Sequence, residues 1–148
     1  MQHYIAASRT NYVFVKDFEA ACFDINQNGN TIHIHPKHKD AIMICGDTAT
    51  GDFNMINHEV DGSVNVFSWK DWATKHLREG QILIVMSIGS EGITKFLHCG
   101  VEAYTWDGFC YEVDPVDHVM GVLRENGYEE VVAAPVYDYV SAGEDHYD

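Results

Sequence analysis

Basic residues and long apolar runs are both scarce in this chain of 148 residues. Nine lysines and arginines stand against 23 aspartates and glutamates, which gives a formal net charge of −14 at pH 7. No apolar run approaches the roughly 20 residues that a membrane-spanning helix needs. The first residues also lack the basic region and the apolar segment of a secretion signal. The sequence therefore predicts a cytoplasmic protein with no membrane helix.

Cysteines are few and widely separated. Cys22, Cys45, Cys99 and Cys110 form no Cys-x-x-Cys pair, which is the usual spacing in zinc sites and thiol oxidoreductases. Unpaired thiols in a reducing compartment are the expected state, and disulfides are the alternative. The composition, 46% hydrophobic and 22% charged, is typical of a globular protein. A chain of this length suits a single domain, which we place at 1–148.

Three helices are predicted from capping residues and a period of 3.6. The first follows Asp17, the second begins after Ser68 and ends at Gly80, and the third begins at Asp114-Pro115 and ends at Gly127. Their expected inward-facing residues are Phe18, Ala21, Cys22 and Ile25, then Trp69, Trp72, Ala73, His76 and Leu77, and finally Val116, Val119, Met120 and Leu123.

Between these helices the pattern alternates with a period of two, which predicts strands. Asp61-Gly62 and Asp107-Gly108 are typical of two-residue hairpin turns, so neighbouring strands should be antiparallel. We therefore expect an α+β fold, a mainly antiparallel sheet with about three helices packed on one face. Residues 131–136 are a possible edge strand, and residues from about 138 to 148 are a possible frayed acidic tail. The predicted strands are 11–15, 31–35, 41–45, 53–60, 63–67, 81–88, 96–106 and 109–113.

Three histidines lie within the stretch 31-TIHIHPKHKD-40. On a strand, His33 and His35 share one face, and His38 follows a proline where the chain turns. The spacing resembles the His-x-His-x-Asp-His motif of metallo-β-lactamase-like hydrolases. However, Lys37 places a positive charge where that motif has its aspartate. A zinc site formed by His33, His35 and His38 is therefore an alternative and not the expected state.

The alternation in the same stretch has a simpler explanation. Threonine, isoleucine and histidine alternate as in a half-buried strand. This pattern predicts that Ile32 and Ile34 point toward the core while His33 and His35 point toward solvent. We therefore interpret the histidines as the polar face of a strand and predict no metal.

Other catalytic arrangements are also missing. No nucleophile elbow surrounds Ser90 or Ser141, and the segment 87–92 lacks the lysine of a phosphate-binding loop. Glu102 and Glu112 lie on strands joined by a hairpin and resemble an acid–base pair. Surface carboxylates are far more common in an acidic protein. No catalytic residue and no cofactor are predicted.

The acidic residues gather toward the C-terminal end. Residues 1–95 hold 11 acids and eight bases, a net charge of −3, whereas residues 96–148 hold 12 acids and one base, a net charge of −11. This charge argues against direct binding of nucleic acid and attracts cationic partners. Improved solubility is the alternative explanation. The candidate partner-binding residues are Glu102, Asp107, Glu112, Asp114, Asp117, Glu125, Glu129 and Glu130.

Two stretches resemble small acidic proteins of phages and conjugative elements. They are 8-SRTNYVFVKD-17, against an RTNYF-x-V-x-D start, and 81-QILIVMSIGSEGITKFLHCGVEAYTWDG-108, against a later acidic hairpin region. The resemblance covers about half of the chain and implies a mobile-element context. Small acidic proteins of such elements often inhibit host defence, including anti-restriction and anti-CRISPR proteins that imitate DNA. No functional residue is transferred from it.

Charge and resemblance lead to one hypothesis for function. A duplex presents one charge per roughly 1.7 Å of its axis, so a rigid array of carboxylates can occupy a groove lined with lysine and arginine. We expect a non-enzymatic inhibitor that blocks a nucleic-acid-binding defence complex in the cytoplasm of a host cell. The alternatives are the metal-dependent hydrolase described above and a structural or assembly protein of a phage.

Overall fold

The computed structural model describes residues 4–91, 97–113 and 115–128. Within these residues it contains three helices and nine strands, and the predicted α+β class is confirmed. None of the described helices is long and apolar enough to span a membrane. The elements are β1 (Tyr4–Thr10), β2 (Val13–Phe14), α1 (Phe18–Asn26), β3 (Thr31–Ile34), β4 (Ala41–Cys45), β5 (Ile56–His58), β6 (Val64–Val66), α2 (Trp69–His76), β7 (Ile82–Glu91), β8 (Leu97–Thr105), β9 (Cys110–Val113) and α3 (Pro115–Glu125).

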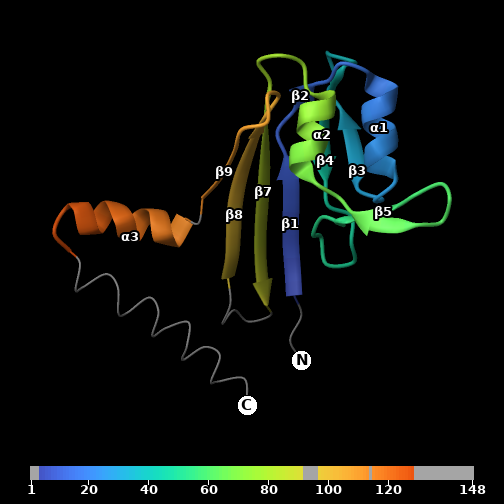
Figure 1. Cartoon of the computed structure of the whole chain (residues 1–148). Coiled ribbons are helices and arrows are strands. Elements are labelled where there is room, and N and C mark those ends of the chain that lie inside the picture. Colours follow the sequence, from blue (N-terminus) through green and yellow to red (C-terminus); the bar gives the residue numbers. More distant parts are fainter. Residues whose placement is uncertain (1–3, 92–96, 114, 129–148) are drawn as a thin grey trace.

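Seven of the strands form one antiparallel sheet (Figure 1). Strand β4 pairs with β1, β2 and β3, and from β1 the sheet continues through β7 and β8 to β9. Strands β5 and β6 form a separate hairpin. The mainly antiparallel arrangement agrees with the prediction from the hairpin-rich sequence.

Strand β1 was not expected, because the first strand was predicted at residues 11–15. The chain is extended from Tyr4 and pairs with β7 over all seven residues of β1, as far as Thr10 opposite Val85. The strand ends before Asn11, whose backbone amide donates to the carbonyl of Ile84 at 3.2 Å while its side-chain amide adds two bonds to the same strand. Its Nδ2 donates to the carbonyl of Ile82 at 3.0 Å, and its Oδ1 accepts from the amide of Ile84 at 2.8 Å. The chain then continues into the short strand β2.

Helices α1 and α2 begin where the capping residues predicted. The side chain of Asp17 accepts a hydrogen bond from the amide of Ala20, and Ser68 accepts one from the amide of Asp71. Each side chain satisfies a backbone donor that the first helical turn leaves free. Both helices lie over the same face of the sheet in Figure 1.

The core lies between these two helices and the sheet. Burying an aliphatic or aromatic side chain of this size contributes roughly 1.5–3 kcal/mol each, which makes this layer the main source of stability. The indole nitrogen of Trp72 also donates to the carbonyl of Ala21 at 3.3 Å and joins the two helices. The buried cluster consists of Val13, Val15, Ala21, Ile25, Ile42, Ile44, Phe67, Trp69, Trp72, Ala73, Leu77, Leu83 and Val85.

Helix α3 is placed differently from the other two. In Figure 1 it extends sideways from the β8–β9 edge of the sheet instead of lying over the sheet. Met120 is buried as predicted, but Val119 is 55% exposed, so its predicted inward position is wrong. The expected helix end is confirmed by Gly127, which has a φ of +90°. The cap residue Asp114, the possible strand at 131–136 and the tail at 138–148 lie outside the described residues.

Both predicted hairpin turns are one residue longer than expected. In the β8–β9 hairpin, the amide of Gly108 donates to the carbonyl of Thr105 at 3.3 Å, and the amide of Thr105 donates to the carbonyl of Phe109 at 2.9 Å. Gly108 has a φ of +96°, which L residues with a side chain rarely adopt. This is a three-residue loop that ends in a glycine bulge, and the β5–β6 hairpin repeats it around Gly62.

Candidate functional site

The β8–β9 hairpin places two of the predicted acidic residues side by side. Glu102 on β8 lies directly opposite Glu112 on β9, so both side chains point from the same face of the sheet. Glu112 is exposed and Glu102 is half-buried. Asp107 is exposed in the loop, where its Oδ1 accepts a hydrogen bond from the hydroxyl of Thr105. The hairpin thus presents three carboxylates.

Glu102 has an environment that disfavours its charge. Partial burial raises the pKa of its carboxyl, and the negative charge of Glu112 raises it further. The hydroxyl of Tyr104 donates to Glu102 Oε1 at 3.2 Å and opposes this rise without cancelling it. Burial and the adjacent Glu102 carboxylate likewise raise the pKa of the Tyr104 hydroxyl. Strongly perturbed groups in a concave region are typical of binding and catalytic sites.

Helix α3 carries the other predicted acids that the structure describes. Asp117 and Glu125 are exposed, and they lie eight residues apart. At about 1.5 Å of rise per residue, roughly 12 Å of helix separates them. The helix that carries these acids extends from the β8–β9 edge away from the sheet (Figure 1). Asp114, Glu129 and Glu130 lie outside the described residues.

A cavity of about 560 Å³ lies beside Glu102. Its walls come from strands β1, β7 and β8, from the start of α2 and from the segment 52–55. Gly46 allows the chain at Gly51 and Asp52 to approach closely, because a Cβ at position 46 would collide with their backbone. The amide of Gly46 also donates to the carbonyl of Ser8 at 2.9 Å, which fixes the loop to β1. Nothing in the sequence pattern indicated this cavity.

The three histidines of residues 31–40 do not converge. The rings of His35 and His38 lie 4.8 Å apart between centroids, and they contact Tyr12 and Phe14 respectively, whereas His33 takes no part in this cluster. The His35 Nδ1 accepts a hydrogen bond from the backbone of residue 37 at 3.0 Å. In the described part of the chain, no three histidine, cysteine, aspartate or glutamate side chains are grouped so that they could hold a metal ion.

The orientation of the strand around these histidines was partly mispredicted. His33 is exposed and Ile32 packs against the core, as expected. Ile34 was also predicted to point inward, but it is 52% exposed. The reason is that β3 is an edge strand, which pairs only with β4.

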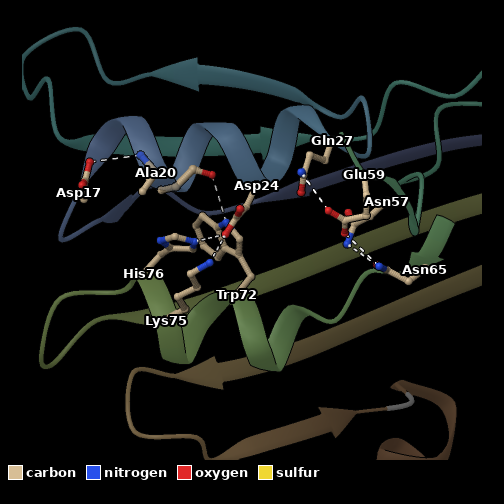
Figure 2. Close-up of polar contacts among 11 residues, drawn as sticks. Asp17, Ala20, Asp24, Gln27, Asn57, Glu59, Asn65, Trp72, Lys75 and His76 are labelled. Carbon is tan, nitrogen blue, oxygen red and sulfur yellow. Dashed lines mark hydrogen bonds and ion pairs between the residues drawn. The ribbon is translucent and has the colours of Figure 1, made fainter. Parts of the chain in front are cut away.

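A polar contact between α1 and α2 was missed by the sequence analysis. Figure 2 shows Asp24 of α1 pointing between His76 and Lys75 of α2, with Asp24 Oδ2 2.5 Å from His76 Nε2 and 3.0 Å from Lys75 Nζ. Partial burial opposes ionisation of Asp24, but the hydrogen bonds and positive charge of its partners lower the pKa of its carboxyl below the ordinary value. His76 was placed on the inner face of α2, and a buried histidine needs a polar partner. The position of His76 on the inner face of α2 was therefore the one feature of the sequence that pointed to a buried polar contact.

A second polar chain lies beside this contact. Gln27 donates to Glu59 Oε2 at 3.2 Å, and Asn65 donates to Glu59 Oε1 at 3.0 Å (Figure 2). These bonds tie α1 to the β5–β6 hairpin at the rim of a hollow of about 420 Å³. Because the hydrogen bonds of Glu59 are formed within the protein, we interpret the chain as structural.

All four cysteines are unpaired, as predicted. Cys99 and Cys110 are exposed on β8 and β9, while Cys22 and Cys45 are half-buried. Burial raises the pKa of the Cys22 thiol. None of the four is part of a disulfide.

Comparison with family models, with curated proteins and with solved structures finds no match to this chain.

Proposed function

We propose that this protein is an acidic inhibitor that binds a nucleic-acid-binding complex of host defence and blocks its access to DNA or RNA. The supporting observation is the uneven charge: residues 96–148 carry a net charge of −11 and residues 1–95 only −3. The acids that the structure describes in this part lie on a hairpin and on a helix that extends from the sheet (Figure 1). Such a surface attracts a cationic groove and repels nucleic acid.

The exposure of these carboxylates supports binding through charge. Asp107, Glu112, Asp117 and Glu125 are exposed, and Arg124 is the only lysine or arginine in the described residues from 97 onward. Exposed carboxylates keep their hydration until a partner arrives, so they steer association at long range. The proposed context, a phage or another mobile element, rests on the resemblance of residues 8–17 and 81–108.

A capture experiment with salt elution tests this function. The protein is immobilised, and lysates of cells that carry restriction or CRISPR systems are passed over it. We expect a nucleic-acid-binding protein to be retained, to elute as salt is raised toward about 1 M, where the Debye length falls to roughly 3 Å, and to be displaced by its own nucleic acid. A retained partner that nucleic acid does not displace would contradict the proposal.

A further inference from the structure

The cavity beside Glu102 adjoins the acidic hairpin and has a polar floor. Antiparallel pairing places Ser8 opposite Ser87 and Val85 opposite Glu102, so these side chains share one face of the sheet. At about 560 Å³ the cavity is within the usual size range of small-molecule sites, roughly 300–1,000 Å³. A smaller hollow of about 400 Å³ adjoins it, is lined by Ser87 and Glu102 as well, and reaches Glu112.

Ser8 indicates that the cavity accepts a hydrogen-bonding ligand. The residue is only 7% exposed, it lines the cavity, and its hydroxyl oxygen has no hydrogen-bond partner. Buried hydroxyl groups are nearly always paired, so an unpaired one calls for an explanation. A polar group of a ligand in the cavity would provide the missing partner.

The charges around the two hollows favour a cation. Three carboxylates line them, those of Asp52, Glu102 and Glu112, whereas Lys70 is the one basic residue among the described residues that do so. Glu102 and Glu112 are directly opposite on neighbouring strands, where two like charges destabilise each other. A positively charged group between them would remove this repulsion.

The walls and the length of the cavity restrict further which ligands fit it. Ser8 and Glu102 are two strands and two residues apart, which is roughly 12 Å between their Cα atoms at about 4.8 Å per strand and 3.4 Å per residue. Val85 lies between them on the sheet, and the cavity is also lined by Phe53, Met55 and Tyr104, which are partly exposed. An extended ligand with polar ends and apolar methylene groups matches a cavity that combines these polar and apolar walls.

We propose that the cavity binds a linear polyamine, with one ammonium group between Glu102 and Glu112 and an amine near the Ser8 hydroxyl. The methylene groups then lie against Phe53, Met55 and Tyr104. Ammonium groups donate up to three hydrogen bonds each, and charge-assisted hydrogen bonds to carboxylates are roughly twice as strong as neutral ones. The site shares Glu102 and Glu112 with the acidic surface of the proposed inhibitor, but binding of the polyamine is measured on the protein alone and does not require that function.

Calorimetric titration with spermidine tests this site, and butylamine, which has a single amino group, serves as the comparison. We expect saturable binding of one spermidine per chain and weaker binding of butylamine. Glu102→Gln should lower the spermidine affinity about tenfold or more, because it removes a charge-assisted contact. Glu79→Gln is the matched control: Glu79 is exposed and does not line the cavity, so this variant should keep the wild-type affinity.

The variant Ser8→Ala distinguishes a role of the serine in binding from a role in stabilising the fold. It should weaken spermidine binding while leaving the free protein at least as stable, because the free protein makes no use of the hydroxyl. Amide chemical shifts on wild-type protein locate the site without any variant, and they should change on β7, on β8 and at the start of α2. Absence of saturable binding, equal loss in Glu79→Gln, or shifts confined to α3 would overturn the proposal.

Discussion

The imidazole of His76 is joined to the carboxylate of Asp24 across 52 residues of sequence, with His76 Nε2 2.5 Å from Asp24 Oδ2. The His76 side chain is only 3% exposed, and that of Asp24 is 25% exposed. The contact connects α1 with α2 at the rim of the core. Because a buried polar ring needs its partner, this pair should matter more for stability than its single bond suggests.

The first prediction concerns this pair. Asp24→Asn should lower the free energy of unfolding by about 1–3 kcal/mol, the usual effect of losing a hydrogen bond to a charged group. Urea denaturation followed by circular dichroism measures it. Lys75→Met removes the other partner of Asp24, whose side chain is 66% exposed. It should cost at most about 1 kcal/mol, as exposed ion pairs do. An equal loss in both variants would show that the exposed lysine is the partner that matters.

The pH dependence of the same variant follows from the lowered pKa of Asp24. A carboxyl whose pKa is lower in the folded state stabilises the fold above its unfolded pKa of about 3.9 and loses this contribution as the pH falls through the folded pKa. The difference in the free energy of unfolding between wild type and Asp24→Asn should therefore have its largest value at pH 6. It should become smaller below about pH 4.

The second prediction concerns Glu102, whose pKa is shifted in the opposite direction. Burial and Glu112 raise the pKa of Glu102, so its charged form is less favourable in the folded state. Ionised Glu102 therefore destabilises the folded protein at any pH above its pKa in the folded state. This destabilisation disappears below its pKa in the unfolded state, about 4.3. Glu102→Gln should therefore stabilise the protein at pH 7, by up to about 1 kcal/mol.

The same substitution in an exposed position is the control for Glu102. Glu125 lies on α3, is exposed and has no directly opposite acid in the sheet. Glu125→Gln should leave the urea midpoint at pH 7 almost unchanged. If the gain from Glu102→Gln persisted undiminished at pH 3, repulsion between ionised carboxylates could not be its cause.

The third prediction concerns the cysteines. A thiol reagent should modify Cys99 and Cys110 first in the native protein, because both are exposed. Cys22 should react later, since burial raises the pKa of its thiol and the thiolate is the reactive form. After denaturation without reductant, all four should react. Two or fewer reactive thiols would indicate a disulfide and a different compartment.

The fourth prediction concerns the histidines of residues 31–40. Elemental analysis of the purified protein should find no stoichiometric zinc, because His33 takes no part in the ring cluster of His35 and His38. The double variant His33→Ala, His35→Ala should keep the same metal content and should lose at most about 1 kcal/mol of stability, which is usual on a strand face. Zinc that is present in wild type and lost in this variant would support the hydrolase alternative.

The features that the sequence predicted well are local. Asp17 and Ser68 cap the first two helices through side-chain bonds that reach only three residues along the chain. Gly127 ends the third helix because its φ is positive. Strand β1 has no such local signal: its partner β7 is more than 70 residues away, so tertiary pairing creates the strand.

The hairpin loop shows how one residue changes a site. With the two-residue turn predicted at Asp107-Gly108, Glu102 would have paired with Val113, and Glu112 would point from the other face. The observed loop contains one more residue and brings Glu102 opposite Glu112. Because side chains alternate between faces, a shift of one residue decides whether the two carboxylates meet. The sequence indicated which acids the hairpin carries, but only the register brings them together.

The fifth prediction tests the acidic surface with matched charge reversals. Glu112, Asp117 and Glu125 are replaced together by lysine in one variant, and Glu19, Asp47 and Glu79 in the other. All six are exposed, both variants change the net charge by the same amount, and each contains one acid from the first turn of a helix. Against the partner identified by capture, the first variant should bind more weakly by orders of magnitude, because a cationic groove repels it.

The control variant separates local contact from net charge. If the hairpin and α3 occupy the groove, reversing acids elsewhere should alter mainly the association rate and the salt dependence, as charges outside the contact do. Circular dichroism should be the same for both variants and for wild type. Wild-type affinity should fall steeply with added salt because of screening. Equal weakening by both variants would mean that net charge alone attracts the partner. Salt-insensitive binding that survives the first variant would point to an apolar, shape-specific interface.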